Sequence, residues 1–111
     1  MSANRIRCFI LEPTDVMVAP HTRAFANPED RSIYVLGWVS TANVLPAPAG
    51  AMWFAAGFGL VVRTPGGDWM VDSGGGHWTR SGKPPCITVE PTVLIGSYHG
   101  RLREGFLEEC S

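Results

Sequence analysis

The fold class is decided by residues 60–72, whose sequence is LVVRTPGGDWMVD. Two runs rich in β-branched and aromatic residues, 60–64 and 68–72, stand on either side of Pro65-Gly66-Gly67. Because such runs form strands and proline and glycine form turns, this stretch predicts an antiparallel hairpin. Residues 98–108 show the same pattern around Arg103-Glu104-Gly105 and predict a second hairpin.

The rest of the chain favours the same class. Its 111 residues fit one domain, residues 1–111, and 45% of them are hydrophobic, which is enough for a core without disulfides or metal. No stretch has the period and caps of an amphipathic helix. We therefore expect an all-β protein, or β with one short helix, of at least five strands, built as a small antiparallel sandwich or partly closed barrel.

The first half of the chain is expected to hold two main strands. Residues 5–12 are predicted to form the first, which ends at a turn over Pro13-Thr14-Asp15. Residues 32–41 place apolar side chains on both faces and are predicted to form the strongest strand of this half. Pro46-Ala47-Pro48-Ala49-Gly50 is interpreted as a crossover loop, because prolines cannot donate to a strand ladder.

Composition and charge exclude several classes of partner. The net charge is −1, with nine basic and ten acidic residues scattered along the chain, so no direct nucleic-acid binding is expected. The longest apolar run, residues 51–62, is too short and glycine-rich to span a bilayer, so no membrane partner is expected. The N-terminus opens no apolar signal region, and three separated cysteines do not suit a disulfide scaffold. These features predict a cytoplasmic protein.

Neither a metal site nor a catalytic site is assigned. The candidate metal ligands are His21, His77, His99, Cys8, Cys86 and Cys110. None of them forms the close pair that structural zinc sites use, so we expect no metal and no cofactor. A nucleophile such as Cys86 or Ser73 would need a base in hydrogen-bond reach, and nothing in the sequence supports one. Asp68 and Asp72 are expected on a solvent-exposed strand face.

Four tryptophans are a high number for a chain of 111 residues. Trp38 and Trp69 lie within predicted strands and are expected in the core. Trp53 follows the proline loop and Trp78 follows a triple glycine, so both are candidates for a binding surface, where tryptophan is enriched. The alternative for Trp78 is that it folds back and caps the core.

Residues 73–85 are interpreted as an adaptable hairpin loop, because they contain three consecutive glycines. Together with the neighbouring face of the last hairpin, this loop is the expected contact region for a partner. The expected partner-binding residues are Trp78, Arg80, Lys83, His77, His99, Arg101 and Trp53.

Four segments of the chain resemble a conserved uncharacterised protein family of tailed phages and prophages. They are residues 7–14 (RCFILEPT), 48–53 (PAGAMW), 60–72 (LVVRTPGGDWMVD) and the C-terminal pieces 87–89 (ITV) and 96–106 (GSYHGRLREGF). Members of that family often carry cysteine-rich pieces before the last strand, where residues 73–85 of this chain have no cysteine. The resemblance therefore implies a phage or prophage origin but carries no metal role to this chain.

A small, nearly neutral chain of this kind is expected to act by binding. We expect a stoichiometric binder of a host factor in the host bacterial cytoplasm, most concretely an inhibitor of a bacterial defence system, anti-CRISPR or similar. Its partner would be a host protein or defence complex, and a homodimer is left open. The alternatives are an enzyme on a small molecule or nucleotide that uses Asp72, His77 and His99, and a minor virion or assembly protein.

Overall fold

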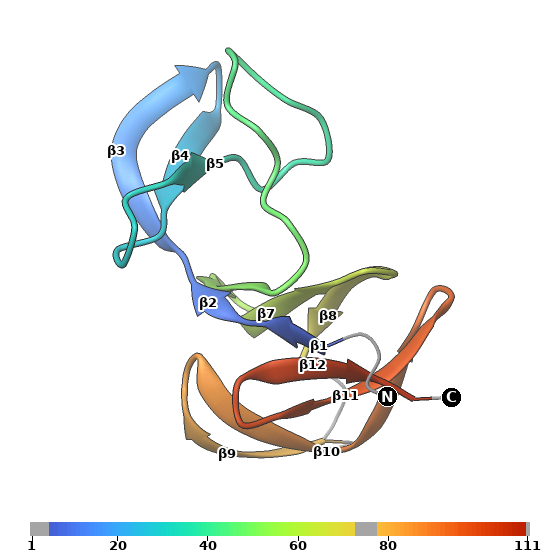
Figure 1. The fold of residues 1–111 in the computed structure, drawn as a ribbon. Coiled ribbons are helices and arrows are strands. Elements are labelled where there is room, and N and C mark those ends of the chain that lie inside the picture. Colours follow the sequence, from blue (N-terminus) through green and yellow to red (C-terminus); the bar gives the residue numbers. More distant parts are fainter. Residues whose placement is uncertain (1–4, 73–77, 111) are drawn as a thin grey trace.

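The computed structural model describes residues 5–72 and 78–110, and these form twelve strands and no helix (Figure 1). The strands make three open sheets, and every strand pair is antiparallel except β2 with β6. The predicted all-β class is therefore confirmed, and the architecture is a small sandwich with an added ribbon. In the described ranges no helix is long and apolar enough to cross a membrane.

Two of the sheets form the sandwich. The first has five strands in the order β1 (Arg5–Arg7), β12 (Phe106–Glu109), β11 (Tyr98–Arg103), β10 (Cys86–Ile95) and β9 (Thr79–Lys83). The second has four strands in the order β2 (Phe9–Ile10), β6 (Ala51–Ala55), β7 (Gly59–Thr64) and β8 (Gly67–Met70).

Both predicted hairpins are present. β7 pairs with β8 across the turn at Pro65-Gly66, and β11 pairs with β12 across Glu104-Gly105. Glu104 and Gly105 both have positive φ, 50° and 82°. Turns with two positive φ values match the right-handed twist of the paired strands, which explains why glycine stands at this position.

The main core lies between the two sheets of the sandwich. Met52, Leu60, Val62 and Trp69 reach it from the four-stranded sheet, and Ile87, Val89, Leu102 and Leu107 reach it from the five-stranded sheet. All eight are at most 1% exposed. The prediction that Trp69 is a core residue is therefore confirmed.

The four-stranded sheet is covered on its other face as well. Leu11, Ala47, Ala51, Trp53 and Val61 form a second buried cluster there. β7 is consequently buried without a break from Leu60 to Thr64. A strand covered on both faces has a continuous apolar run instead of an alternating one.

The third sheet projects from the sandwich (Figure 1). It contains β3 (Glu12–Ala19), β4 (Thr22–Ala26) and β5 (Ile33–Tyr34) in that order. We call residues 12–46, which comprise this sheet and the loop that follows it, the arm. The proline segment 46–50 connects the arm to β6. It therefore crosses from one sheet to another, as predicted.

Two predictions for the N-terminal strand are wrong. Residues 5–12 do not form one strand but are divided among β1, β2 and the start of β3, which belong to three different sheets. No turn occurs at Pro13-Thr14-Asp15, because these residues lie within β3. β3 is an edge strand, and a proline is tolerated there because the side without a partner needs no donor.

Three more predictions fail further along the chain. In the segment 32–41 only Ile33–Tyr34 forms a strand, because Val35 then pairs with Pro46 and the chain bends away. Trp38 is therefore not a core residue, and 61% of it is exposed. Residues 79–83, expected within a loop, form the edge strand β9, which pairs with β10.

Candidate interaction surfaces

The arm carries an apolar surface. Six of the ten large apolar side chains that the described residues expose belong to it, namely Val16, Met17, Ile33, Trp38, Val39 and Leu45. We call these six exposed side chains the arm patch. A groove of about 580 Å³ lies on the arm, between β4 and the loop that follows β5, and Phe25, Trp38 and Val39 are among its lining residues.

Arg63 fastens the loop of the arm to the sandwich. Its side chain is 2% exposed, and its Nε and Nη2 donate to the Asp68 carboxylate at 2.8 and 3.2 Å. Nη1 donates to the carbonyl of Ala47 at 3.0 Å, and Nη2 also donates to the carbonyl of Leu36. One buried guanidinium therefore joins β7, β8 and two points of the loop between β5 and β6.

Two tryptophans stack on the same guanidinium. The Arg63 Cζ lies 4.0 Å from the centroid of the Trp38 ring and 5.1 Å from that of Trp53. The contact holds Trp38 in place although most of its surface is exposed. Trp53, which the sequence placed among the partner-binding residues, is only 5% exposed and packs in the second buried cluster.

A second surface covers the outside of the five-stranded sheet. Strand alternation turns Ile6, Leu102 and Leu107 inward and leaves the charged residues between them outside. Five of these are cations, and we call them the basic face: Arg5, Arg7, Lys83, Arg101 and Arg103. Prediction from the sequence assigned Lys83 and Arg101 to a partner surface but missed the three other arginines, and the signal it offered for them was the Arg-x-Arg spacing in β1 and again in β11.

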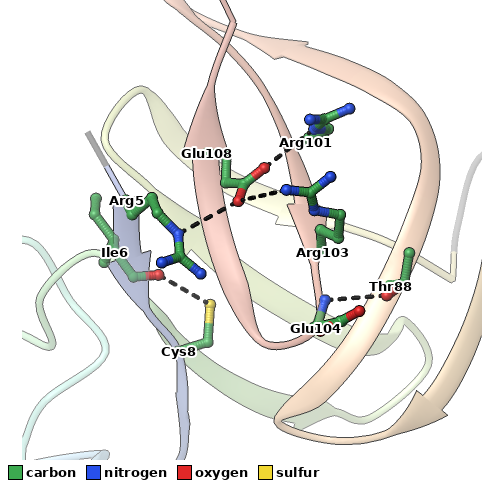
Figure 2. Close-up of polar contacts among 8 residues, drawn as sticks. All are labelled: Arg5, Ile6, Cys8, Thr88, Arg101, Arg103, Glu104 and Glu108. Atoms are coloured by element: carbon green, nitrogen blue, oxygen red, sulfur yellow. Dashed lines mark hydrogen bonds and ion pairs between the residues drawn. The ribbon is translucent and has the colours of Figure 1, made fainter. Parts of the chain in front are cut away.

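Glu108 lies in the middle of this face, and Figure 2 shows three guanidinium groups turned toward it. Nε of Arg5, Nε of Arg101 and Nη2 of Arg103 lie 3.2–3.3 Å from its carboxylate oxygens. Desolvation alone would raise the pKa of Glu108, but the Arg101 hydrogen bond and the charges of the three arginines outweigh it and lower that pKa. Glu108 is therefore ionised at neutral pH.

The other predicted contact residues are divided between surfaces. Lys83, His99 and Arg101 are exposed on the outer side of the five-stranded sheet. Trp78 instead packs edge-on against Trp69, with ring centroids 5.6 Å apart. This agrees with the alternative stated for Trp78, in which its side chain folds back and caps the core. His77 lies outside the described residues.

Arg80 forms a bidentate ion pair with Asp72, at 2.7 and 3.1 Å. Asp72 also accepts a hydrogen bond from the backbone amide of Leu60 at 3.0 Å. Desolvation would raise the pKa of Asp72, but the Leu60 amide and the Arg80 guanidinium outweigh it and lower that pKa. A carboxylate held ionised in this way anchors β9 to the four-stranded sheet.

Two residues of the enzyme alternative, Asp72 and His99, come from different sheets. Asp72 follows β8 and His99 lies on the exposed side of β11 in the other sheet, so the two do not belong to one surface. Burial raises the pKa of the Cys8 thiol to about 12, although a backbone hydrogen bond opposes this, and the thiol stays protonated. Among the described residues no three histidine, cysteine, aspartate or glutamate side chains gather as metal ligands would.

Comparison with known proteins adds no relative. No protein-family model matches the chain, and neither a curated protein nor a solved structure matches it. The function is therefore argued from the two surfaces themselves.

Proposed function

We propose that this chain is a phage- or prophage-encoded accessory protein that binds a host protein through the arm patch. Its most concrete form is inhibition of a bacterial defence system, anti-CRISPR or similar, in the host cytoplasm. The observation that carries the proposal is the concentration of exposed apolar side chains on the arm. Exposed large apolar side chains concentrated in one region are typical of protein–protein interfaces. The phage origin rests on the resemblance of the four sequence segments.

The chemistry of the patch supports a protein partner. Trp38 is a large aromatic side chain, and tryptophan is the residue type most enriched among interface hot spots. Its contact with Arg63 orders the ring before binding, so less side-chain entropy is lost when a partner covers it. Val39 and Leu45, 75% and 63% exposed, add apolar area on the same loop.

The proposal is tested by phage plating on bacteria that carry a defined defence system. Cells that express the protein are expected to let phage form plaques on a strain whose defence system otherwise prevents them. The double variant Val39→Asp/Leu45→Asp should lose this effect, because two carboxylates would be buried unpaired in the interface. Leu94→Asp is the matched control, since Leu94 is 69% exposed but lies in β10 of the sandwich.

The same variants are then used in pull-downs against the purified components of the defence system that responds. Wild type and Leu94→Asp should retain one component at equal stoichiometry, and the arm variant should not. The proposal would be contradicted if the protein inhibited no defence system in the panel tested. It would also be contradicted if the arm variant inhibited as well as wild type. Recovery of the protein in purified phage particles would favour the virion alternative instead.

A further inference from the structure

The basic face is a concentration of charge that the composition of the chain conceals. Five of the nine basic residues lie on it, although the net charge is −1. Much of the compensating negative charge lies elsewhere, because the arm holds four carboxylates, Glu12, Asp15, Glu29 and Asp30, against two arginines. Two further aspartates are occupied by Arg63 and Arg80.

The strand register arranges the face in two rows across the sheet. In the first, Arg5, Glu108 and Arg101 lie side by side on β1, β12 and β11. In the second, Arg7, Phe106 and Arg103 lie side by side on the same strands. Neighbouring strands are about 4.8 Å apart, and the two rows are separated by two residues, or roughly 6.7 Å.

The two rows carry more positive than negative charge. Glu108 is shared by three guanidiniums, each of which keeps donors that a single carboxylate cannot satisfy. Among the described residues, Arg7 and Lys83 form no ion pair at all. Glu90 on β10 and Glu104 in the turn border the face, but neither belongs to the row of Arg7 and Arg103.

An aromatic ring stands in the centre of the second row. Phe106 points away from the core, because its neighbour Leu107 is fully buried. The Arg5 guanidinium covers the Phe106 ring, with Cζ 4.0 Å from the ring centroid. Stacked arginine planes and aromatic rings are the surfaces on which unpaired bases stack.

We propose that the basic face binds single-stranded nucleic acid. Arg7 and Arg103 contact phosphates on either side of the Phe106–Arg5 stack, and a base packs on that stack. Guanidinium forks match phosphate oxygens in a bidentate manner, and four of the five cations on this face are arginines. The stack favours a nucleic acid over an acidic polypeptide, which would supply charge but no bases. This inference is independent of the arm patch.

The test is fluorescence anisotropy with labelled 15-nucleotide oligo-dT and oligo-U over a series of salt concentrations. Wild type should bind, and the logarithm of the affinity should fall linearly with the logarithm of the salt concentration. Arg7→Gln/Arg103→Gln should weaken binding about tenfold or more and reduce that slope by roughly 1.4, since each phosphate contact on a single strand contributes about 0.7. The two oligonucleotides distinguish DNA from RNA as the ligand.

Two controls separate this face from charge in general. Arg23→Gln/Arg31→Gln removes the same charge from the arm and should leave the affinity and slope unchanged. Phe106→Leu keeps an apolar residue in β12 and should weaken oligonucleotide binding roughly fivefold or more through lost stacking. If Arg103→Gln impairs folding, Arg7→Gln/Lys83→Gln replaces it, since neither of these side chains forms an ion pair in the described chain.

Three results would overturn the inference. The first is that neither oligonucleotide binds. The second is that the arm variant loses as much affinity as the variant of the basic face. The third is that polyglutamate displaces the oligonucleotide as efficiently as unlabelled oligonucleotide, which would show a general anion surface or an acidic polypeptide site.

Discussion

The sandwich and the arm use similar residues in opposite ways. In the sandwich, a second sheet covers the apolar side chains, and Leu60, Val62 and Leu102 are fully buried. In the arm, comparable side chains such as Val16 and Val39 are more than half exposed, because no sheet faces the ribbon. The core of the sandwich is therefore formed by its own two sheets, whereas the exposed side chains of the arm patch contribute little to folding and are free for a partner. Other apolar residues of the arm, Phe25, Tyr34 and Leu36, pack against the second buried cluster.

The two regions meet at a polar contact. Arg63 takes its ion pair from the β7–β8 hairpin and its carbonyl acceptors from Leu36 in the loop of the arm and from Ala47 in the proline segment that follows it. A buried guanidinium is expensive to desolvate and is stable only with all its partners in place. The first prediction breaks this contact and should have the largest effect.

Arg63→Leu is expected to destabilise the protein by about 3–5 kcal/mol, because it leaves Asp68 and two carbonyl groups without their donor. Chemical denaturation with two probes measures the loss. Arg63→Lys keeps the charge but not the fork and should recover only part of the stability. A loss below about 1 kcal/mol for Arg63→Leu would show that the contact does not hold the arm.

The second prediction compares the two regions directly. Leu102→Ala removes a fully buried side chain between the two sheets and should cost about 2–5 kcal/mol. Val39→Ala trims a side chain that is 75% exposed on the arm and should change the free energy of unfolding by less than about 0.5 kcal/mol. Urea denaturation of both variants checks the difference, and equal costs would contradict the distinction.

The third prediction concerns the edge of the sandwich. Trp78→Ala should cost about 1–3 kcal/mol, because the ring packs edge-on against Trp69 and on the core. Thermal unfolding would show the loss as a lower Tm. An unchanged Tm together with lost partner capture would return Trp78 to the binding surface.

The smallest expected effect is on the acid side of the pH–stability profile. The pKa values of Asp72 and Glu108 are lowered in the folded protein, so the unfolded chain binds more protons. The stability that they contribute is complete above their ordinary pKa values, 3.8 and 4.5, and is lost as pH falls through the lower folded values. Asp72→Asn and Glu108→Gln should each flatten the decline of the unfolding free energy below about pH 4.5.

Urea denaturation at pH 7 and pH 3.5 measures this effect in wild type and both variants. Glu104→Gln is the matched control, since Glu104 is exposed and forms no ion pair among the described side chains. Its decline should match that of wild type. Identical declines in all four proteins would contradict the assignment of acid sensitivity to these two carboxylates.

How far the sequence predicts this molecule depends on how local the cause is. The two hairpins follow from turn residues beside the strands that they join, and both are present. The division of residues 5–12 among three sheets depends on pairing with β12 and β6, far along the chain, and no local pattern contains it. The alternation in residues 32–41 predicts a covered strand, but whether a covering sheet exists is a property of the whole fold.

Prediction of the interaction surfaces from the sequence has the same limit, because local pairs can be anticipated and contacts between distant segments cannot. A contact between Arg63 and the start of the second strand could be anticipated from the predicted hairpin, and the observed two-residue turn sets Asp68 directly opposite Arg63. The stacking of Trp38 on Arg63 could not, since it depends on the path of the loop. The basic face was hidden because its arginines come from both ends of the chain and meet only when β1 pairs with β12.

Native-state hydrogen exchange of the free protein tests the central claim, that the sandwich is the stable scaffold and the β3–β4 ribbon of the arm is less stable than it. Amides in the β3–β4 ladder, such as those paired between Met17 and Arg23, should exchange through local opening with free energies well below that of global unfolding. Amides in the β10–β11 and β11–β12 ladders should exchange only through global unfolding. Equal protection of the two regions, at the global value, would contradict the account.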